Sequence, residues 1–402
     1  MSMRNHPSRT SFITLAVAAF IASSGCATAA RGHLSPEQKR IEKAFNQAWA
    51  KGEKSLKQDL ATLGQVAAAF RAAVARTWGK NDAKVADRTV FVKYTEHYHT
   101  RASVDFEHGT IAVETLDGDD PRGSLKKALV ATLLTPGDPR AVDLFSDAGV
   151  KIDEGREPYL AGLVVDEKGR PVRVRADAER YADWLVANRV RTHAVEGDEG
   201  TRTAHVVKIA MVANFSHKNA EKYRSAVARS AERYKVSQSL VFAIIRTESN
   251  FNPFAVSPVP AFGLMQLVPK SGGRDAYRRA KGIDQAPSTE YLFDADNNIE
   301  LGAAYLDLLT SAHLGQITNP VAREYCVIAA YNTGAGNVLK TFGPDRAHAI
   351  AAINALGPDA VFERLRRDLP YEETRQYVGR VVGYRRQFLN WDAGTAQALA
   401  SR

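Results

Sequence analysis

Cysteine is scarce in this chain, with two residues, Cys26 and Cys326, among 402. Two cysteines cannot cross-link several domains, so the protein must be stabilised by packed cores and not by a disulfide framework. Glycine and proline are also modest, at 28 and 16 residues, which excludes a collagen-like or wholly disordered chain. At roughly 150 residues per domain, the length predicts two or three domains.

Hydrophobic runs long enough to cross a membrane are lacking as well. Residues 12–22 (FITLAVAAFIA) form an uncharged apolar run, but a transmembrane helix needs about 20 such residues. Because Arg4 and Arg9 precede this run and small residues follow it, the pattern is typical of a secretory signal. A multispanning membrane protein is excluded, and the chain is expected to be exported.

Two processing sites compete after this run. Residues 23–26 (SSGC) resemble a bacterial lipobox, in which the cysteine becomes the lipidated first residue, although Ser23 stands where a branched residue is usual. Residues 27–29 (ATA) instead fit release as a soluble protein. We expect residues 1–25 to be a signal of the lipoprotein type and Cys26 to be lipidated, with soluble export as the alternative. Cys326 lies in an apolar stretch and is predicted to be a small buried residue.

The excess of positive charge is moderate, with 54 Lys and Arg against 45 Asp and Glu and a net charge of +9. Basic and acidic residues alternate along the chain, so no basic arm indicates a nucleic-acid partner. The balance favours an anionic partner such as a phospholipid surface or an acidic wall polymer. A solvated surface of mixed charge is the alternative.

The first half of the exported chain combines helical and strand patterns. Apolar residues recur every three or four positions from residue 35 to 78, and similar helices are expected at 124–134 and 177–191. Alternating β-branched and aromatic residues predict strands at 89–94, 102–106, 110–116 and 203–213. Residues 33–215 are therefore predicted to form an α+β N-terminal domain, in which strands distant in sequence share one sheet.

The remainder of the chain has only helical patterns. Residues 216–235 (SHKNAEKYRSAVARSAERYK) are polar and charged, and are predicted to form one connecting helix. Beyond Val236 the apolar segments read as helices separated by Pro and Gly. Residues 236–392 are therefore predicted to form an all-α domain.

One carboxylate stands at the end of an apolar helix. Residues 240–247 (LVFAIIRT) lead directly to Glu248, where a low dielectric and the negative end of the helix dipole both raise the pKa of a carboxyl group. Such a group keeps its proton near neutral pH and can donate it to a glycosidic oxygen. A surface ion pair after the helix is the other reading of an isolated glutamate.

Two further segments favour the catalytic reading. Residues 261–266 (AFGLMQ) place a glycine beside Gln266, whose amide offers both a donor and an acceptor to a sugar, and residues 330–334 (AYNTG) end an apolar helix. Together with ESNFNP at 248–253 and ETRQYV at 373–378, they resemble the motifs of the soluble lytic transglycosylase family. Residues 91–95, 102–106 and 133–144 are similar to the N-terminal domain of the membrane-bound lytic murein transglycosylase C family.

These resemblances imply a fold, a reaction and a set of site residues. The expected architecture is an α+β N-terminal domain followed by an all-α, lysozyme-like catalytic domain. The implied enzyme needs no cofactor or metal and cleaves the β-1,4 bond between N-acetylmuramic acid and N-acetylglucosamine of peptidoglycan, leaving 1,6-anhydromuramic acid ends. Its lipid anchor at Cys26 would hold it on the periplasmic side of the outer membrane. The family motifs assign acid and base catalysis to Glu248 and substrate binding to Ser257, Gln266, Tyr331, Asn332 and Tyr377.

Two rival functions remain open on the sequence. A muramidase that admits water would need a second acid, for which Glu300 and Asp296 are candidates. A wall-binding lipoprotein without activity would keep the fold for recognition alone, although a pure binder gains nothing from a buried acid. His97 and His99 are a weak metal motif without a third ligand in pattern, and are expected to be surface residues.

Overall fold

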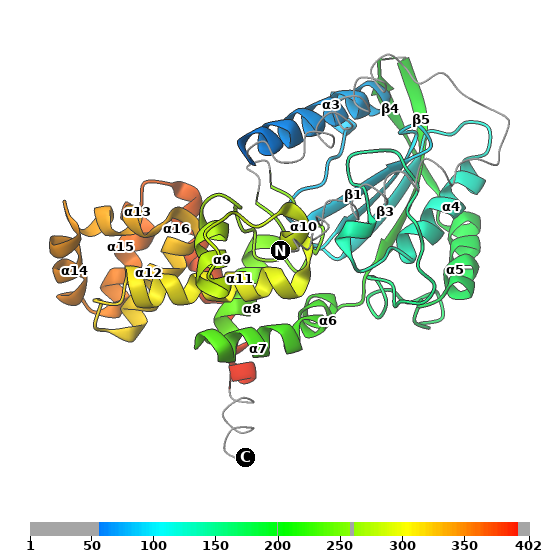
Figure 1. Ribbon diagram of the computed structural model, residues 1–402. Helices are drawn as coiled ribbons and strands as arrows, with labels where there is room; N and C mark the ends of the chain where they lie inside the picture. Colours follow the sequence, from blue (N-terminus) through cyan, green and yellow to red (C-terminus); the bar gives the residue numbers. More distant parts are fainter. Residues whose placement is uncertain (1–55, 199, 258–260, 393–402) are drawn as a thin grey trace, which may run out of the picture.

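The computed structural model describes residues 56–198, 200–257 and 261–392, with side chains from residue 66 onward. The expected signal and Cys26 lie outside these residues. So does the first part, up to residue 55, of the helical region predicted from residue 35. Within the described ranges, no helix combines the length and apolar character needed to span a membrane. Figure 1 shows a sheet with helices α3, α4 and α5 on the right and an assembly of helices on the left.

The first part is built on a five-stranded antiparallel sheet, with strands in the order β1-β2-β3-β5-β4. Strands β3 and β5 are distant in sequence but pair within this sheet, with Val113 opposite Val207. This confirms that distant strands share one sheet. The strands are β1 (Val90–Thr95), β2 (Thr100–Asp105), β3 (Thr110–Thr115), β4 (Arg191–Gly197) and β5 (Gly200–Ala210).

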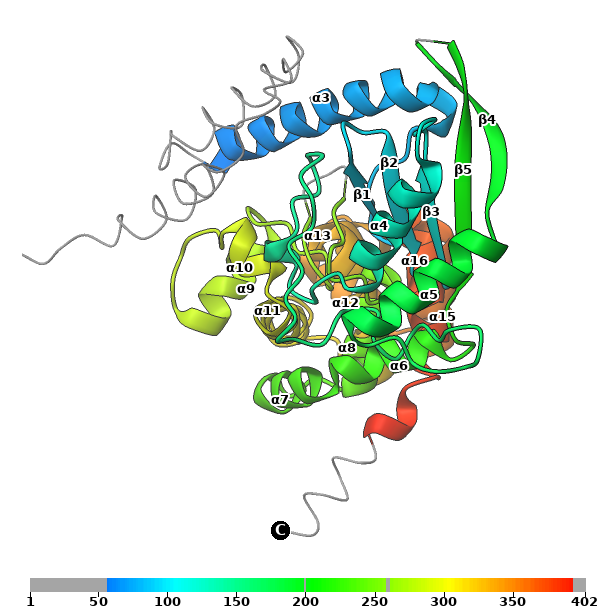
Figure 2. The same ribbon diagram turned by 90° about the vertical axis from the view of Figure 1, so that its right-hand side faces the viewer.

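Helices cover both faces of this sheet (Figure 2). The long helix α3 (Leu56–Asp82) packs Phe70 and Trp78 on one face, against residues such as Tyr94. Helices α4 (Pro121–Leu133) and α5 (Arg175–Asn188) pack on the other face, where Phe91 and Ile111 are buried. Alternate residues of β1 thus enter two different cores, as the period of a strand requires.

The edge of the sheet corrects the sequence prediction. The helix expected over 177–191 ends at Asn188, and Arg191 begins strand β4, which was not predicted. Strand β4 is an edge strand in which Val195 is the buried residue, and its sequence RTHAVEG has no alternation of apolar and polar residues. A strand that buries one side chain leaves almost no periodic signal in the sequence.

The predicted connecting helix is also wrong as a single element. It divides into α6 (Phe215–Lys222) and α7 (Arg224–Tyr234), with Tyr223 outside helical geometry at φ −102° and ψ 3°. Ala220, Tyr223 and Val227 are buried in the core of the helical part. The segment is therefore part of that core rather than a spacer.

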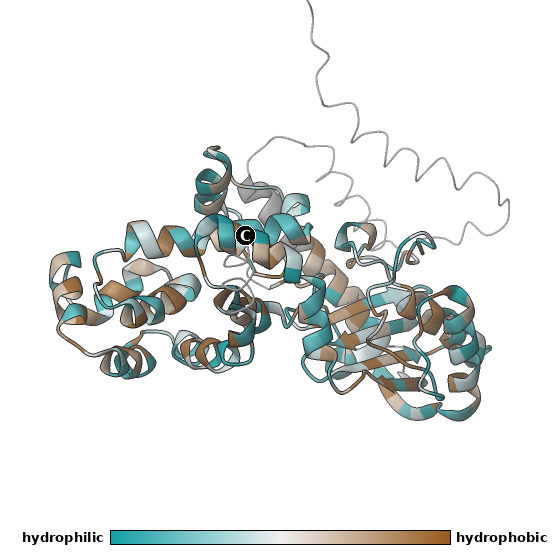
Figure 3. Ribbon diagram, turned by 90° about the horizontal axis from the view of Figure 1, so that it is seen from below, coloured by the Kyte–Doolittle hydropathy of each residue, from teal (hydrophilic) through white to brown (hydrophobic). Residues whose placement is uncertain are grey.

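The second part is entirely helical within the described residues, apart from isolated bridges at residues 256, 262 and 267, which confirms the predicted class. Helix α8 (Gln238–Ser249) lies at its centre, with residues 241–245 fully buried. Most surrounding helices alternate hydrophilic and hydrophobic residues in Figure 3, as expected for amphipathic helices around a core. They are α9 (Gly272–Lys281), α10 (Thr289–Phe293), α11 (Ala295–Leu308), the π-helix η2 (Leu309–His313), α12 (Pro320–Thr333), α13 (Ala335–Phe342), α14 (Arg346–Asn354), α15 (Pro358–Asp368) and α16 (Glu372–Arg385).

The segment that follows α8 joins the two parts. Phe254 is 1% exposed and belongs to the core of the α+β part, with its ring 4.8 Å from that of Phe91 and 5.8 Å from that of Tyr159. The Tyr159 hydroxyl donates a hydrogen bond of 2.6 Å to the Phe251 carbonyl. A second link is the ion pair of 3.3 Å between Arg140, in the short helix η1 (Pro139–Ala141), and Asp294. The end of α8 is thus fixed against both parts of the molecule.

Candidate active site

Glu248 is the next-to-last residue of α8 and is 6% exposed. Its helix is anchored by the buried apolar residues at 241–245 and ends at Asn250, which adopts a left-handed conformation at φ 46°. The carboxyl group therefore lies at the negative end of a buried helix, where both the dipole and the low dielectric oppose its ionisation. This is the environment that the sequence predicted for it.

The turn after Glu248 is unusual because two consecutive residues other than glycine have positive φ. Asn250 and Phe251 lie at φ 46° and 64°, and each such conformation costs of order 1–3 kcal/mol. Surrounding contacts hold both in place: the Asn250 amide donates to the Phe106 carbonyl, and the Phe251 ring is fully buried. The turn directs the chain away from α8 toward the α+β part.

The acid has an unusual proton affinity. Burial raises the pKa of Glu248 to about 7 from an ordinary value of 4.5, while the hydrogen bond from Tyr377 and the charge of Arg88 act in the opposite direction. Below about pH 7 the carboxyl group therefore carries its proton. A protonated carboxylic acid at neutral pH can act as a general acid.

Tyr377, which the motif assigned to substrate binding, contacts Glu248 directly. Its side chain is fully buried, and its hydroxyl donates a hydrogen bond of 2.8 Å to Glu248 Oε1. Burial, followed by the charge of Glu248, raises the pKa of the Tyr377 phenol well above its usual value. Tyr377 is therefore a fixed donor that orients the carboxyl group.

Tyr331 lies near the same carboxylate but bonds elsewhere. Its hydroxyl donates to the Met265 carbonyl at 2.9 Å, and Glu248 is one of the groups that raise its pKa. Asn298 supports the same turn, since its Oδ1 accepts from the Met265 amide at 2.8 Å. Gly263 in this turn has φ +74°, and a Cβ there would lie 2.4 Å from the Leu292 carbonyl oxygen. The GLMQ turn is thus built around a required glycine.

Gln266 differs from the expectation that both ends of its amide are available to a sugar. Its Nε2 donates to the carbonyls of Gly263 and Ala255 at 2.9 and 3.2 Å. Its Oε1 is buried and has no partner among the described residues. The side chain therefore offers one acceptor and no free donor.

The remaining two predicted binding residues are Asn332, at the end of α12, and Ser257, in the loop after α8. Asn332 follows Tyr331 at the end of α12, and its Oδ1 accepts from the Thr374 hydroxyl at 2.6 Å. Ser257 is half-buried in the loop after α8, where its backbone amide donates to the Ala261 carbonyl at 3.3 Å. Asn332 thus ties α12 to α16, the helix that carries Tyr377.

Sequence reasoning missed two charged residues beside Glu248. Arg88 Nη1 lies 3.8 Å from Glu248 Oε2 and 3.5 Å from Glu373 Oε1. Arg88 precedes strand β1 in the α+β part, 160 residues from Glu248 in the sequence, so no local pattern could have paired them. Glu373 was noted only as a motif residue, and its charge raises the pKa of Glu248.

The two alternative acids are engaged elsewhere. Asp296 accepts from Arg229 at 2.8 Å, and Glu300 accepts from Arg233 and Lys281 at 2.7 Å each. Both carboxylates are on α11 and pair with cations of α7 and α9.

The histidine motif and the second cysteine occupy ordinary positions. His97 has an exposed side chain 3.5 Å from Asp147, as expected, whereas His99 is half-buried and its Nε2 lies 3.1 Å from Arg202 Nη1. The part of the chain that the structure describes has no group of three or more residues suited to hold a metal ion. Cys326 is fully buried, and burial raises the pKa of its thiol to about 12, in agreement with a small core residue.

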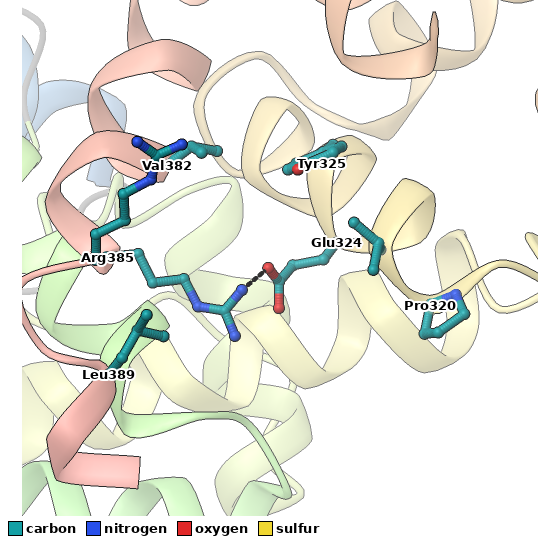
Figure 4. Close-up of a pocket in the computed structure, with 8 residues that line it drawn as sticks. Pro320, Glu324, Tyr325, Val382, Arg385 and Leu389 are labelled. Atoms are coloured by element: carbon teal, nitrogen blue, oxygen red, sulfur yellow. Dashed lines mark hydrogen bonds and ion pairs between the residues drawn. The ribbon is translucent and has the colours of Figure 1, made fainter. Parts of the chain in front are cut away.

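A separate cavity of about 330 Å³ lies between α12 and α16 (Figure 4). Arg385 forms an ion pair with Glu324 inside it, and Pro320, Tyr325 and Leu389 contribute to its wall. None of the site residues predicted from the sequence lines this cavity. The arrangement around Glu248 is therefore distinct from it.

Comparison with known proteins identifies the class. Residues 225–354 match the family described as the transglycosylase SLT domain, and residues 56–222 match that of the membrane-bound lytic murein transglycosylase C N-terminal domain. The two matches meet close to Tyr223, at the break between α6 and α7. The chain is thus an enzyme of the lytic transglycosylase class.

Two relatives narrow this to one family. Membrane-bound lytic murein transglycosylase C from Cronobacter sakazakii is 42% identical over 344 residues, covering 86% of this chain and 92% of that protein. The protein of the same name from Sodalis glossinidius is 42% identical over 311 residues, covering 77% and 85%. This chain therefore belongs to the membrane-bound lytic murein transglycosylase C family, which confirms the resemblance seen in the sequence.

A solved structure covers a smaller part of the chain. The lytic transglycosylase Slt of Pseudomonas aeruginosa, solved as an inactive mutant, is 34% identical over 40% of this chain and 23% of its own, with a TM-score of 0.32. This chain thus matches about a quarter of that protein's length.

Proposed function

We propose that this enzyme cleaves the β-1,4 bond between N-acetylmuramic acid and N-acetylglucosamine of peptidoglycan, with Glu248 as the single acid and base. The neutral carboxyl group donates its proton to the glycosidic oxygen, and the bond from that oxygen to C1 of the muramic acid breaks. The substrate's acetamido group assists at C1. The resulting carboxylate then takes the proton of the C6 hydroxyl while the oxygen of that hydroxyl forms a bond to C1. This step gives a 1,6-anhydro end and consumes no water.

The observation that carries this proposal is the state of the Glu248 carboxyl group. It is buried, its pKa is raised to about 7, and its Oε1 accepts from Tyr377 at 2.8 Å. A group with a pKa near the working pH can give up a proton and take one back at small cost. A glycosidase that admits water ordinarily uses two carboxylates, and the two candidates from the sequence, Asp296 and Glu300, pair with cations of α7 and α9.

The proposed substrate contacts rest on one buried acceptor without a partner among the described residues and on motif positions. The unpartnered Oε1 of Gln266 suits the N–H of an acetamido group, because a buried acceptor gains most from a matched donor. We assign Ser257 and Asn332 to the glycan on the basis of their motif positions. Tyr331 supports the turn that carries Gln266 through its bond to Met265.

Mass spectrometry of fragments released from purified peptidoglycan tests the reaction. The mature chain is expected to release muropeptides one water lighter than hydrolysis products, and Glu248→Gln is expected to release none. Glu363→Gln, which changes an exposed carboxylate on α15, is the matched control and should retain activity. Reducing-end products would instead indicate a muramidase. Sacculus binding without cleavage by the unaltered chain would indicate a binding protein.

We propose further that Cys26 carries the lipid that anchors the enzyme on the periplasmic side of the outer membrane. Relatives are named membrane-bound, and Cys26 closes the lipobox-like sequence. Labelling with a radioactive fatty acid should mark the unaltered protein and fail to mark Cys26→Ser. Equal labelling of both would contradict lipidation at Cys26, and an unlabelled, soluble unaltered protein would favour the alternative of release into the periplasm.

A further inference from the structure

Arg88 is a cation of the α+β part that lies beside the acid of the helical part. Its Nη1 is 3.8 Å from Glu248 Oε2, while Tyr377 donates to the other carboxylate oxygen, Oε1. The two oxygens of Glu248 therefore have partners from different parts of the molecule. The Arg88 side chain is 34% exposed, so it sits at the border between the buried carboxyl group and solvent.

The backbone around Arg88 is fixed against the loop that follows Glu248. The side-chain amide of Asn252 donates to the Arg88 backbone carbonyl at 3.2 Å, and the backbone amide of Val256 donates to the Asp87 carbonyl at 3.4 Å. On the other side, Asp87 Oδ1 accepts the amides of residues 89 and 90 at 2.7 Å each. Arg88 is therefore held in register with the end of α8 by both of its neighbouring segments.

We propose that Arg88 is a positioning residue for Glu248, through which the N-terminal part completes the catalytic site of the helical part. This inference rests on the proposed function, because it concerns the ionised form of Glu248 that follows the first proton transfer. Burial disfavours that form, and an adjacent cation offsets the cost. The contact at Oε2 also directs the carboxylate plane, since Tyr377 fixes only Oε1.

Several charged or titratable groups face Glu248, and they act in different directions. Tyr377 and Tyr331 stay neutral because burial raises their pKa well above the usual value. On α16, the charge of Glu373 raises the pKa of Glu248 and that of Arg380 lowers it. Arg88 pairs with both Glu248 and Glu373. Removal of Arg88 therefore leaves Glu373 unopposed by its partner, and both changes raise the pKa of Glu248.

The test compares the pH dependence of three variants of the mature full-length enzyme. Arg88→Gln is expected to shift the alkaline limb of kcat/KM for release of anhydromuropeptides upward by roughly half to one pH unit. Its kcat at pH 6 should fall about three- to tenfold, since a weaker acid transfers its proton less readily. Arg88→Lys, which retains the charge, should have its alkaline limb at the same pH as the unaltered enzyme. Arg140→Gln, which removes the ion pair with Asp294 between the same two parts, should leave the limb unchanged.

The outcomes separate this inference from the proposed function. If Arg88→Gln lowers the rate equally at every pH and does not move the limb, Arg88 only fastens the two parts together and the inference is wrong. If Arg88→Gln does not fold, Arg88→Lys still decides, because a limb displaced in that variant contradicts a role of the charge. If the unaltered enzyme releases no anhydro product, the proposed function itself fails.

Discussion

Replacement of Glu248, the proposed catalytic acid, should stabilise the fold, and increasingly so as the pH rises. The pKa of Glu248 is raised from 4.5 to about 7 on folding. Between these values the unfolded chain releases the proton while the folded protein retains it, so the stability of the unaltered protein falls with increasing pH. Above about pH 7 the full cost of the buried charge is present.

The size of this effect follows from the shift. At about 1.4 kcal/mol per pKa unit, the rise of the pKa from 4.5 to about 7 corresponds to about 3–4 kcal/mol. Glu248→Gln is neutral at every pH and its amide oxygen can still accept from Tyr377. The variant should therefore match the unaltered protein near pH 4 and exceed its free energy of unfolding by about 3–4 kcal/mol at pH 8.5, with a higher Tm.

Urea and thermal unfolding at pH 4, 6, 7 and 8.5 would measure this difference. Glu363→Gln is the matched control, because its carboxylate is exposed on α15, and its stability difference should stay small at each pH. A difference for Glu248→Gln that does not change with pH would refute the reasoning. So would a variant that is less stable than the unaltered protein at pH 8.5.

Three further substitutions test other parts of the site. Tyr377→Phe removes the donor to Glu248 and should lower kcat about tenfold while moving the alkaline limb of the pH–rate profile upward. Phe254→Ala empties a position in the core of the α+β part, and urea unfolding should show a loss of about 3–5 kcal/mol. Gly263→Ala places a Cβ 2.4 Å from the Leu292 carbonyl oxygen at φ +74°, and should lower the free energy of unfolding by about 2–3 kcal/mol, measured in the same way.

The sequence predicted those parts of the fold whose signals are local. Strands β1 to β3 bury alternate residues in two cores, so their pattern is visible in any short window. Residues 240–245 of helix α8 form a continuous apolar run because this part of the helix is buried at the centre of the helical part. The position of Glu248 at its end follows directly from the end of that apolar run.

The features that the sequence did not predict depend on contacts between distant segments. Strand β4 lies at the edge of the sheet and buries one residue, so its sequence has almost no alternation of apolar and polar residues. The polar segment around Tyr223 is divided into two helices and packs its ring in a core formed with later helices, which its own sequence does not show. Arg88 and Glu248 lie in different parts of the molecule, 160 residues apart in sequence, and meet where the loop after α8 packs Phe254 into the α+β part. The donor of Gln266 is consumed by two carbonyls, which a motif cannot reveal.

The balance of forces on Glu248 explains how one carboxyl group can serve both proton transfers of the proposed reaction. Burial alone favours the neutral acid needed in the first step and makes the carboxylate needed in the second step costly. The hydrogen bond from Tyr377 and the charge of Arg88 oppose burial. With these effects combined, the pKa is about 7, so near neutral pH the two forms differ little in free energy. A stronger contact with a cation would lower the pKa of Glu248, so that the group would already be ionised before the first step. Burial without Tyr377 and Arg88 would raise the pKa further, so that the carboxylate needed in the second step would be too costly to form.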